Sequence, residues 1–342
     1  MGAYNAIEKE LRAGARRWVV TGAAGFIGSH LCERLLSLGQ RVVGIDNFST
    51  GQRRNIQFLT GLSTAAANFS FIEADICDYE KYGQALGGAD YLLHQAALGS
   101  VSRSIDKPLD TNRANVDGFL CVIEAARKSK IQRCVFASSS SVYGDAPELP
   151  KIEARIGNAL SPYAVSKRIN ELYAEVYGRV YGTQLIGLRY FNVFGPRQDP
   201  SGAYAAVIPR WIAALAQDQE CTIYGDGETS RDFCFVENVI QANILAATTT
   251  HADAIGKHYN IACHGRTTLR QLHAEIGRAF SKLRPNFKLR EVRFGDFRAG
   301  DVRHSLASIE LAQRNLGYAV AVDFAAGIEQ TVNWYLQNPS KA

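Results

Sequence analysis

The chain has 342 residues and a formal net charge of +5, and 46% of its residues are hydrophobic and 21% are charged. This length suits one large domain or two lobes around a sizeable core, and the composition is that of an ordinary soluble globular protein. The positive charge is spread along the chain, and no basic stripe interleaved with aromatic residues is present, so a nucleic-acid partner is not expected.

Cysteine usage and apolar patterning indicate the compartment. Seven cysteines are scattered along the chain, and none forms a C-x-x-C pair or another metal-ligand spacing. We interpret them as small buried residues in a reducing compartment, so neither disulfides nor a metal site is expected. No apolar run approaches the roughly 18 residues of a membrane span, and residues 1–17 lack the apolar centre of a secretory signal. A cytoplasmic protein without a membrane partner is therefore expected.

Buried strands and amphipathic helices alternate over residues 17–195. The patterns predict strands at 17–21, 41–46, 68–76, 91–97, 132–140 and 184–196, and helices at 29–39, 110–130 and 162–182. Such alternation is typical of an α/β protein with a Rossmann-type, doubly wound parallel sheet that is covered on both faces.

A second region is expected after residue 195. Prolines and a glycine between residues 196 and 202 mark loops, and the regular alternation ends there. We therefore place a first domain at 1–195 and a smaller, discontinuous region at 196–342. Parts of 232–265 are expected to return to the first domain, because they contain a strand, a loop and a helix.

The stretch VVTGAAGFIGSHL places Gly22, Gly25 and Gly28 between a predicted strand and a predicted helix. In a dinucleotide-binding loop, one glycine forms the tight turn, another allows the backbone to approach a pyrophosphate, and the third allows helix and strand to pack closely. The helix N-terminus then offers unpaired N–H groups to the phosphates. This context favours a dinucleotide site over a turn without a ligand.

Asp46 ends the second predicted strand, where a carboxylate can accept hydrogen bonds from a ribose diol. It would also repel a 2′-phosphate, so NAD is favoured over NADP. Arg53 and Arg54 lie nearby and could soften that repulsion, but we interpret them as solvated loop charges.

The stretch SPYAVSK spaces Tyr163 and Lys167 four residues apart, at the start of a predicted helix. Ser161 can act as the N-cap, and Pro162 suits the first helical position. At this spacing the two side chains lie on the same face, one turn apart. An isolated Y-x-x-x-K usually means two surface side chains, so a functional reading depends on the other motifs.

TGAAGFIGSHL, SSSSVYG and SPYAVSK together make the chain resemble the extended short-chain dehydrogenase/reductases over nearly its whole length. Within that family it is similar to the UDP-sugar 4-epimerases. The segments HQAALGSVSRSI, LRYFNVFGPRQDPSGAYAAVIPRW, IYGDGETSRDFCFVENV and GDVRHSLA resemble the subgroup acting on UDP-N-acetylglucosamine. The resemblance implies that 1–195 bind NAD, that 196–342 mainly bind the UDP-sugar, and that helices from residues 111 and 162 pair across a homodimer.

The resemblance also implies a set of site residues. Tyr163 and Lys167 match the catalytic pair, and Ser139 matches the serine that binds the sugar hydroxyl, although Ser140 or Ser141 could share that role in the run of four serines. The cofactor-binding residues are expected to be Gly22, Gly25, Phe26, Ile27, Gly28, Asp46, Asn47, Ser49, Thr50, Gly51, Asp75, Ile76, Gln95, Ala96, Ala97, Asn115, Tyr163, Lys167 and Tyr190. The substrate-binding residues are expected to be Gly99, Ser100, Ser139, Ser140, Ser141, Asn192, Ala206, Val207, Tyr224, Arg231, Arg298, Asp301 and Ser305.

These residues permit a two-pass hydride mechanism. A free tyrosine has a pKa near ~10, so it is a poor base at neutral pH unless nearby positive charge favours the phenolate. We expect the ammonium of Lys167 and the charge of oxidised nicotinamide to lower the pKa of Tyr163. Tyr163 would then take the proton of the sugar 4-hydroxyl, and a 4-keto intermediate would rotate before it is reduced from its other face.

Ser305 bears on the choice of substrate. It stands where the glucose-restricted epimerases carry a tyrosine, so the resemblance implies room for an acetamido group on carbon 2. Relatives preferring UDP-N-acetylglucosaminuronate are not separated by the sequence, and Arg103 could meet a carboxylate in either group. Ser102 replaces a proline that is frequent in related enzymes, which leaves the stiffness of this loop open.

Two other enzyme classes of the same fold are disfavoured. Dehydratases carry an Asp-Glu pair, and decarboxylases usually a glutamate, where this chain has Ser140 and Ser141. UDP-glucuronate 4-epimerases share the serine run and stay open. A protein that senses NAD without turnover is disfavoured, because such relatives typically lose the tyrosine or the lysine.

Overall fold

The computed structural model describes residues 2–201, 204–297 and 303–338. Its centre is a seven-stranded parallel sheet with the strand order β11-β6-β5-β4-β1-β2-β3. The strands are β1 (Arg17–Thr21), β2 (Arg41–Asp46), β3 (Phe69–Glu73), β4 (Tyr91–His94), β5 (Arg133–Ser139), β6 (Leu185–Tyr190) and β11 (His258–Ile261). The expected Rossmann-type fold is confirmed, and the chain reverses its winding direction between β1 and β4, where such sheets bind ligands.

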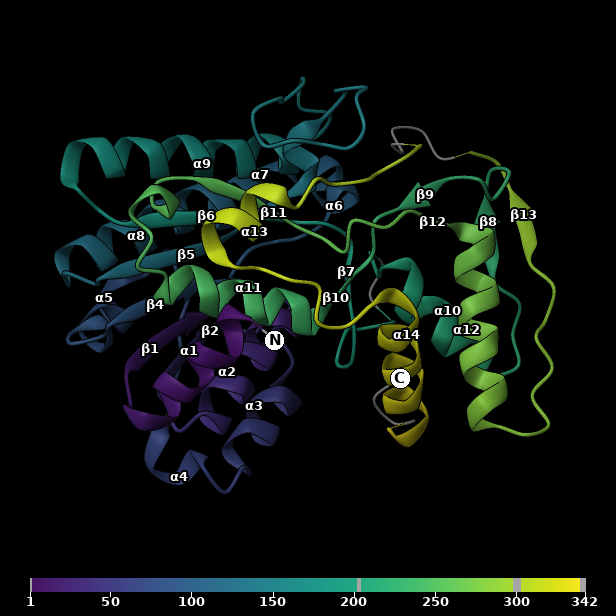
Figure 1. The fold of residues 1–342 in the computed structure, drawn as a ribbon, viewed down its shortest axis with the longest axis horizontal. Coiled ribbons are helices and arrows are strands. Elements are labelled where there is room, and N and C mark those ends of the chain that lie inside the picture. The colour runs from purple at the N-terminus through teal and green to yellow at the C-terminus, as the bar shows by residue number, and fades with distance from the viewer. Residues whose placement is uncertain (1, 202–203, 298–302, 339–342) are drawn as a thin grey trace.

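Two apolar cores cover the two faces of this sheet, because successive strand residues point to opposite sides. Val20 belongs to the core that includes α2 and α11, whereas Val19 belongs to the core that includes α8 and α9. The sheet is therefore buried on both faces, which explains why its strands are almost continuously apolar. Figure 1 shows the sheet with these helices in the larger part of the molecule.

The helices around the sheet vary from single turns to twenty residues. They are α1 (Ala3–Ala13), α2 (Phe26–Ser37), α3 (Arg53–Thr60), α4 (Ala65–Asn68), α5 (Tyr79–Tyr82), η1 (Gly83–Leu86), α6 (Val101–Asp106), α7 (Pro108–Asn112), η2 (Arg113–Asp117), α8 (Gly118–Lys128), η3 (Ser140–Tyr143), α9 (Pro162–Tyr181), α11 (Val236–Thr248), η4 (Ala252–Ala254) and α13 (Glu310–Leu316). Among the described residues, no helix is both long enough and apolar enough to cross a membrane.

A smaller group of elements packs beside the sheet, at the right of Figure 1. It comprises α10 (Val207–Ala216), β8 (Thr222–Tyr224), α12 (Leu269–Leu283), β13 (Arg293–Gly295) and α14 (Phe324–Gln337), with the short strands β7 (Val193–Phe194), β10 (Cys234–Phe235), β9 (Ser230–Arg231) and β12 (Thr267–Thr268) between the two parts. The chain crosses between the parts more than once, since α11 packs on β4, β5 and β6, and β11 joins the edge of the main sheet.

The long helix predicted over residues 110–130 is interrupted. A π-helical turn, η2, separates α7 from α8, and Asn115 lies buried at its centre. Its side chain accepts a hydrogen bond from the Leu98 amide at 2.8 Å and donates to the Leu98 carbonyl and to Ser166. The wider turn directs this asparagine into the protein, and such turns often occur at functional sites.

Candidate active site

A cleft of about 1300 Å³ runs along the carboxyl ends of the strands. Its wall on the sheet side follows β1, β2, β4, β5 and β6, and its other wall comes from the smaller group of elements. Of the predicted site residues, the following line it: Gly22, Gly25, Phe26, Ile27, Gly28, Asp46, Asn47, Ser49, Thr50, Asp75, Ile76, Gln95, Ala96, Ala97, Gly99, Ser100, Ser139, Ser140, Ser141, Tyr163, Lys167, Tyr190, Asn192, Ala206, Arg231 and Ser305.

The glycine loop packs tightly against the neighbouring backbone at two of its glycines. Gly22 has a φ of 73°, and a Cβ placed there would lie 2.7 Å from the backbone nitrogen of Ala96. A Cβ on Gly28 would lie 2.0 Å from the Gly22 carbonyl oxygen, so helix and strand can pack this closely only with glycine. No side chain caps α2, which leaves its first N–H groups directed at the cleft. This cradle fits the pyrophosphate of a dinucleotide.

Asp46 is held firmly at the end of β2. Its carboxylate accepts hydrogen bonds from the backbone N–H groups of Ala24 at 3.0 Å and Phe48 at 2.8 Å. Burial raises the pKa of Asp46, and these hydrogen bonds oppose the rise. Nearby Arg53 forms a two-pronged ion pair with Glu73 at 2.8 and 3.0 Å and is thereby occupied on the surface. The arrangement suits a ribose diol, as in NAD.

Tyr190 forms a fixed part of the sheet-side wall. Its hydroxyl donates to Gln95 Oε1 at 3.0 Å and accepts from Asn243 Nδ2 at 2.8 Å, and Gln95 donates to Asn243 in turn. At the other end of the cleft, Asn47 donates to the carboxylate of Asp75 at 3.2 Å. These hydrogen bonds hold Tyr190, Gln95 and Asn47 in fixed orientations.

Tyr163 and Lys167 enter the cleft from the first turns of α9. The Ser161 hydroxyl accepts a hydrogen bond from the Ala164 amide at 3.1 Å and caps this helix, as the sequence predicts. The Lys167 ammonium donates to the Ala137 carbonyl at 2.8 Å and lies 5.9 Å from the centroid of the Tyr163 ring. Burial lowers the pKa of Lys167 to about 8, although the Glu171 carboxylate opposes this effect.

The expected lowering of the Tyr163 pKa is not found in the protein alone. Burial raises the pKa of Tyr163, and a hydrogen bond with Ser139 opposes the rise. The phenol loses its hydration in the cleft, and this desolvation is the largest influence on its pKa. The expected lowering by Lys167 together with oxidised nicotinamide stays a prediction. The oxidised nicotinamide ring, as part of NAD, would add the positive charge that favours the phenolate.

The four serines have different environments. The Ser138 hydroxyl donates to Glu171 at 2.7 Å, away from Tyr163, whereas Ser139 accepts hydrogen bonds from the backbone N–H and the hydroxyl of Ser141 at 3.1 and 2.9 Å. Neighbouring strand residues alternate in direction, so Ser138 and Ser139 cannot both face the phenol. This favours Ser139 over Ser138 as the serine that meets a substrate hydroxyl.

The far wall brings together residues distant in the sequence. Ser305 donates its backbone N–H to the Ser230 carbonyl at 3.0 Å, which places it beside Arg231. Asn192, which follows β6, donates to the Asp232 carbonyl at 3.1 Å and so ties the chain after β6 to the residue that follows β9. Arg298 and Asp301, which were predicted to contact the diphosphate and the ribose, lie outside the described residues.

Four predicted residues do not line the cleft. Gly51 packs against Asp46, and a Cβ on it would lie 2.7 Å from Asp46 Oδ1. Asn115 supports the cleft from behind through Leu98, and Val207 begins α10 with its side chain against the core. Tyr224 ends β8 outside the lining. They were placed by their position in motifs, which does not reveal whether a side chain reaches the cavity.

Several lining residues were not predicted as site residues. They include Ala24, Gln52, Asn55, Lys151, Arg197, Gln198, Tyr204 and His304. Asn55, for example, is buried and donates to the Ala24 carbonyl at 2.8 Å, which fixes the start of α3 against the glycine loop. No local pattern marks such residues, because their contacts are with segments far away along the chain.

The fold and the cleft define a dinucleotide-dependent α/β enzyme whose cleft also contains Tyr163 and Lys167. The sequence matches the NAD dependent epimerase/dehydratase family over residues 18–262, and the chain belongs to this family. It is 36% identical to a UDP-glucose 4-epimerase of Mycolicibacterium smegmatis over 321 residues, which cover 93% of this chain and 98% of that protein.

Two solved structures are also similar. A UDP-N-acetylglucosamine 4-epimerase from Methanobrevibacter ruminantium, in complex with UDP-N-acetylmuramic acid, shares 36% identity with a TM-score of 0.86, covering 95% of this chain and 99% of that one. A UDP-glucuronic acid 4-epimerase from Bacillus cereus, in complex with UDP-glucuronic acid and NAD, shares 30% identity with a TM-score of 0.82, covering 94% and 99%. These matches confirm the expected family and NAD as the cofactor.

Proposed function

We propose that this UDP-sugar 4-epimerase interconverts UDP-N-acetylglucosamine and UDP-N-acetylgalactosamine. The observation that carries the choice of sugar is the position of Ser305, a small residue in the wall of the cleft that also contains Tyr163 and Ser139. A small side chain there leaves space for an acetamido group on carbon 2, and the similar archaeal structure is of an enzyme named for UDP-N-acetylglucosamine.

Each polar residue beside the sugar has a separate role in epimerisation. When bound, NAD supplies reversible hydride transfer to and from carbon 4 of the sugar. Tyr163 accepts the proton of the 4-hydroxyl and later returns one, while Ser139 orients that oxygen by a hydrogen bond. Lys167 stabilises the phenolate through space, with its ammonium held on the Ala137 carbonyl.

Between the two hydride transfers the 4-keto sugar rotates in the cleft to present its other face, so the nucleotide has to be anchored more firmly than the sugar. Arg231 suits this anchoring role, because a guanidinium presents a fork of donors to diphosphate oxygens. Asn192 adds a polar group to the same wall. Arg298 and Asp301 stay part of the proposal on the strength of the sequence motifs.

A second candidate substrate is the uronic acid form, UDP-N-acetylglucosaminuronate or UDP-glucuronate. Arg103 lines the cleft, and its guanidinium packs 5.1 Å from the centroid of the Tyr204 ring. A carboxylate on the sugar would find a cation there. The similar Bacillus cereus enzyme, crystallised with UDP-glucuronic acid, supports this alternative.

Initial rates decide between these substrates. Purified protein is incubated with UDP-N-acetylglucosamine, its galacto isomer and both uronates, without added NAD, and the products are separated by chromatography and mass. We expect interconversion of the N-acetylhexosamines at the highest kcat/KM. Faster uronate interconversion would support the second candidate, and loss of water or carbon dioxide, or no turnover of any UDP-sugar, would contradict the proposal.

We also propose that the enzyme is a homodimer. Helices α6, α7 and α9 contact one another and expose a set of large apolar side chains: Val101, Ile105, Leu109, Val165, Leu172, Val176 and Val180. Exposed apolar side chains gathered on helices that contact one another often mark an interface. Their place on α6, α7 and α9 suits a second copy of the same surface, related by a two-fold axis.

A further inference from the structure

Glu171 is a buried carboxylate behind the catalytic groups, and it has no role in the proton transfers described above. It lies on α9, one turn after Lys167 and two turns after Tyr163, and its side chain is fully buried. Its two oxygens accept four hydrogen bonds, from Ser138 Oγ at 2.7 Å, Arg189 Nε at 2.8 Å, Arg189 Nη2 at 2.9 Å and Arg168 Nη1 at 3.0 Å. These donors occupy all the lone-pair sites of an ionised carboxylate.

The two strand residues held by Glu171 are direct neighbours in the sheet. Ser138 on β5 is in register with Arg189 on β6, and the next pair in register is Ser139 and Tyr190, both of which line the cleft. The carboxylate therefore binds the pair of residues immediately before Ser139 and Tyr190, and strand side chains alternate in direction from one residue to the next. One side chain thus joins the catalytic helix to both strands.

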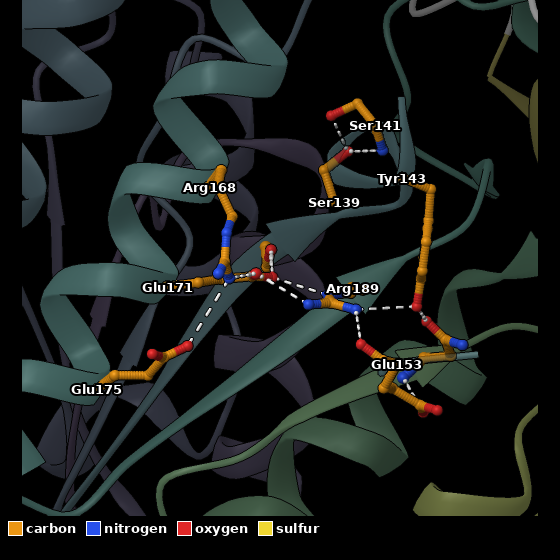
Figure 2. Close-up of polar contacts among 10 residues, drawn as sticks. Ser139, Ser141, Tyr143, Glu153, Arg168, Glu171, Glu175 and Arg189 are labelled. Carbon is orange, nitrogen blue, oxygen red and sulfur yellow. Dashed lines mark hydrogen bonds and ion pairs between the residues drawn. The ribbon is translucent and has the colours of Figure 1, made fainter. Parts of the chain in front are cut away.

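Arg189 extends the network toward the substrate wall. In Figure 2 it lies between Glu171 and Tyr143, and it donates to the Tyr143 hydroxyl at 3.0 Å and to the Glu153 carbonyl at 2.9 Å. Tyr143 donates in turn to Asn260 at 2.6 Å, and Asn260 donates to the Ser308 carbonyl at 3.0 Å. The same network therefore reaches the segment that carries Ser305.

Glu171 also provides the negative charge next to the catalytic lysine. It raises the pKa of Lys167 against the lowering by burial. The other titratable groups around Lys167 are Tyr163 on α9 and His94 on β4, and burial lowers the pKa of His94 to about 3, which keeps it neutral. Glu171 itself faces the cations of Arg168 and Arg189 and the neutral, buried His258, whose pKa burial lowers to about 4.

We propose that Glu171 is a positioning residue that holds Tyr163 and Lys167 in register with Ser139. The inference rests on the proposed function, because these three residues are its catalytic groups. A buried ion pair often adds little to the stability of a protein. Its better attested role is to select one packing arrangement of the surrounding elements over others. The four hydrogen bonds of Glu171 serve that use, since they fix the rotation and height of α9 above β5 and β6.

The test compares Glu171→Gln with Glu175→Gln, which removes the same charge one turn further along α9. Glu175 also pairs with Arg168, at 3.7 Å, but it is more than a third exposed, whereas Glu171 is fully buried. We expect Glu171→Gln to lower kcat about 10-fold to 100-fold with little change in KM, because displacement by ~1 Å can cost about this much. The alkaline limb of its kcat–pH profile should shift to lower pH than in the wild type. The profile of Glu175→Gln should match that of the wild type.

A second readout does not need the sugar. NMR titration of Lys167 labelled with ¹³C at Cε should show a lower pKa in Glu171→Gln than in the wild type and in Glu175→Gln. If the wild type turns over no UDP-sugar, the proposed function fails, while this titration still tests the coupling. A folded Glu171→Gln protein with wild-type kcat, pH profile and lysine titration would overturn the inference.

Ser138→Ala covers the case in which Glu171→Gln does not fold. It removes one of the four hydrogen bonds and leaves the ion pair with Arg189 in place. We expect a smaller decrease in kcat, about 3-fold to 10-fold, at unchanged KM and unchanged bound NAD. Wild-type kcat in a folded Ser138→Ala protein, with Glu171→Gln unfolded, would mean that the carboxylate is only structural and would also overturn the inference.

Discussion

The ammonium of Lys167 is bound to the Ala137 carbonyl at 2.8 Å, and it acts on Tyr163 only through space. Its charge is therefore fixed in position before any ligand enters. Because burial raises the pKa of Tyr163, the phenol of the protein alone stays protonated near neutral pH. We expect the positive charge of oxidised nicotinamide to favour the phenolate, the form that can accept a proton.

Replacing Tyr163 with phenylalanine should lower kcat about 10²-fold to 10⁴-fold, the usual contribution of a general acid–base group. Tyr173→Phe is the matched control, since it makes the same change on the same helix, at a partly buried site in the apolar core. Initial rates with UDP-N-acetylglucosamine and thermal unfolding are measured for both variants. Full activity in a folded Tyr163→Phe protein would contradict the assignment.

Replacing Ser305 with tyrosine should separate the substrates. A bulky ring in this wall would collide with the acetamido group, so kcat/KM for UDP-N-acetylglucosamine should fall more than about tenfold, corresponding to about 1.4 kcal/mol or more. The rate with UDP-glucose should change little. Ser305→Ala is the control for loss of the hydroxyl, and equal losses on both sugars in Ser305→Tyr would argue against a role in specificity.

Replacing Gly28 with alanine should displace α2 and release NAD. The added Cβ would lie 2.0 Å from the Gly22 carbonyl oxygen, which is backbone and cannot rotate away. Gly14→Ala is the control, because a Cβ at Gly14 meets nothing within 4 Å. Bound NAD is measured after denaturation of the purified proteins. Stoichiometric NAD in Gly28→Ala would show that the loop tolerates a side chain.

The buried Asp232 should make stability depend on pH. Burial raises the pKa of Asp232 to about 6, against two backbone hydrogen bonds that its carboxylate accepts from Cys263 and Ala307. Its ordinary pKa is about 3.9, so the folded state binds the proton more tightly. The contribution of Asp232 is therefore fully present below about pH 4 and is lost as the pH rises to about 6.

The Asp232→Asn variant should lack the decrease in stability with pH that Asp232 causes. Its free energy of unfolding in urea should therefore fall less between pH 4 and pH 6 than that of the wild type. Asp253→Asn, at an exposed position on η4, is the control and should keep the wild-type slope. A slope that is unchanged in Asp232→Asn would mean that another group is responsible.

Charges on the exposed apolar surface of α7 and α9 should break the proposed dimer. Leu109 and Val180 are 84% and 64% exposed, so Leu109→Lys and Val180→Lys need not disturb the fold of one chain. Analytical ultracentrifugation at micromolar concentration should give about twice the chain mass of 37.5 kDa for the wild type and the single mass for the double variant. Leu289→Lys, on a different surface, should stay dimeric, and a wild type of single mass would refute the dimer.

Local pattern was enough to predict the sheet and its loop. The strands that became β1, β2, β4, β5 and β6 are short apolar runs bounded by polar residues or glycine, and α9 has apolar residues at helical spacing. Both patterns depend only on neighbours in sequence. The fold class, the family and NAD were confirmed for this reason. The assignments of individual site residues stay predictions, although most of those within the described residues line one cleft.

The sequence by itself determined the Rossmann-type fold, the glycine loop and the spacing of Tyr163 and Lys167, because each is written in residues close together along the chain. Only the tertiary structure decided that Ser138 faces Glu171 while Ser139 faces the phenol, and that burial raises the pKa of Tyr163. These outcomes depend on solvent exclusion and on partners tens of residues apart, which no local pattern contains.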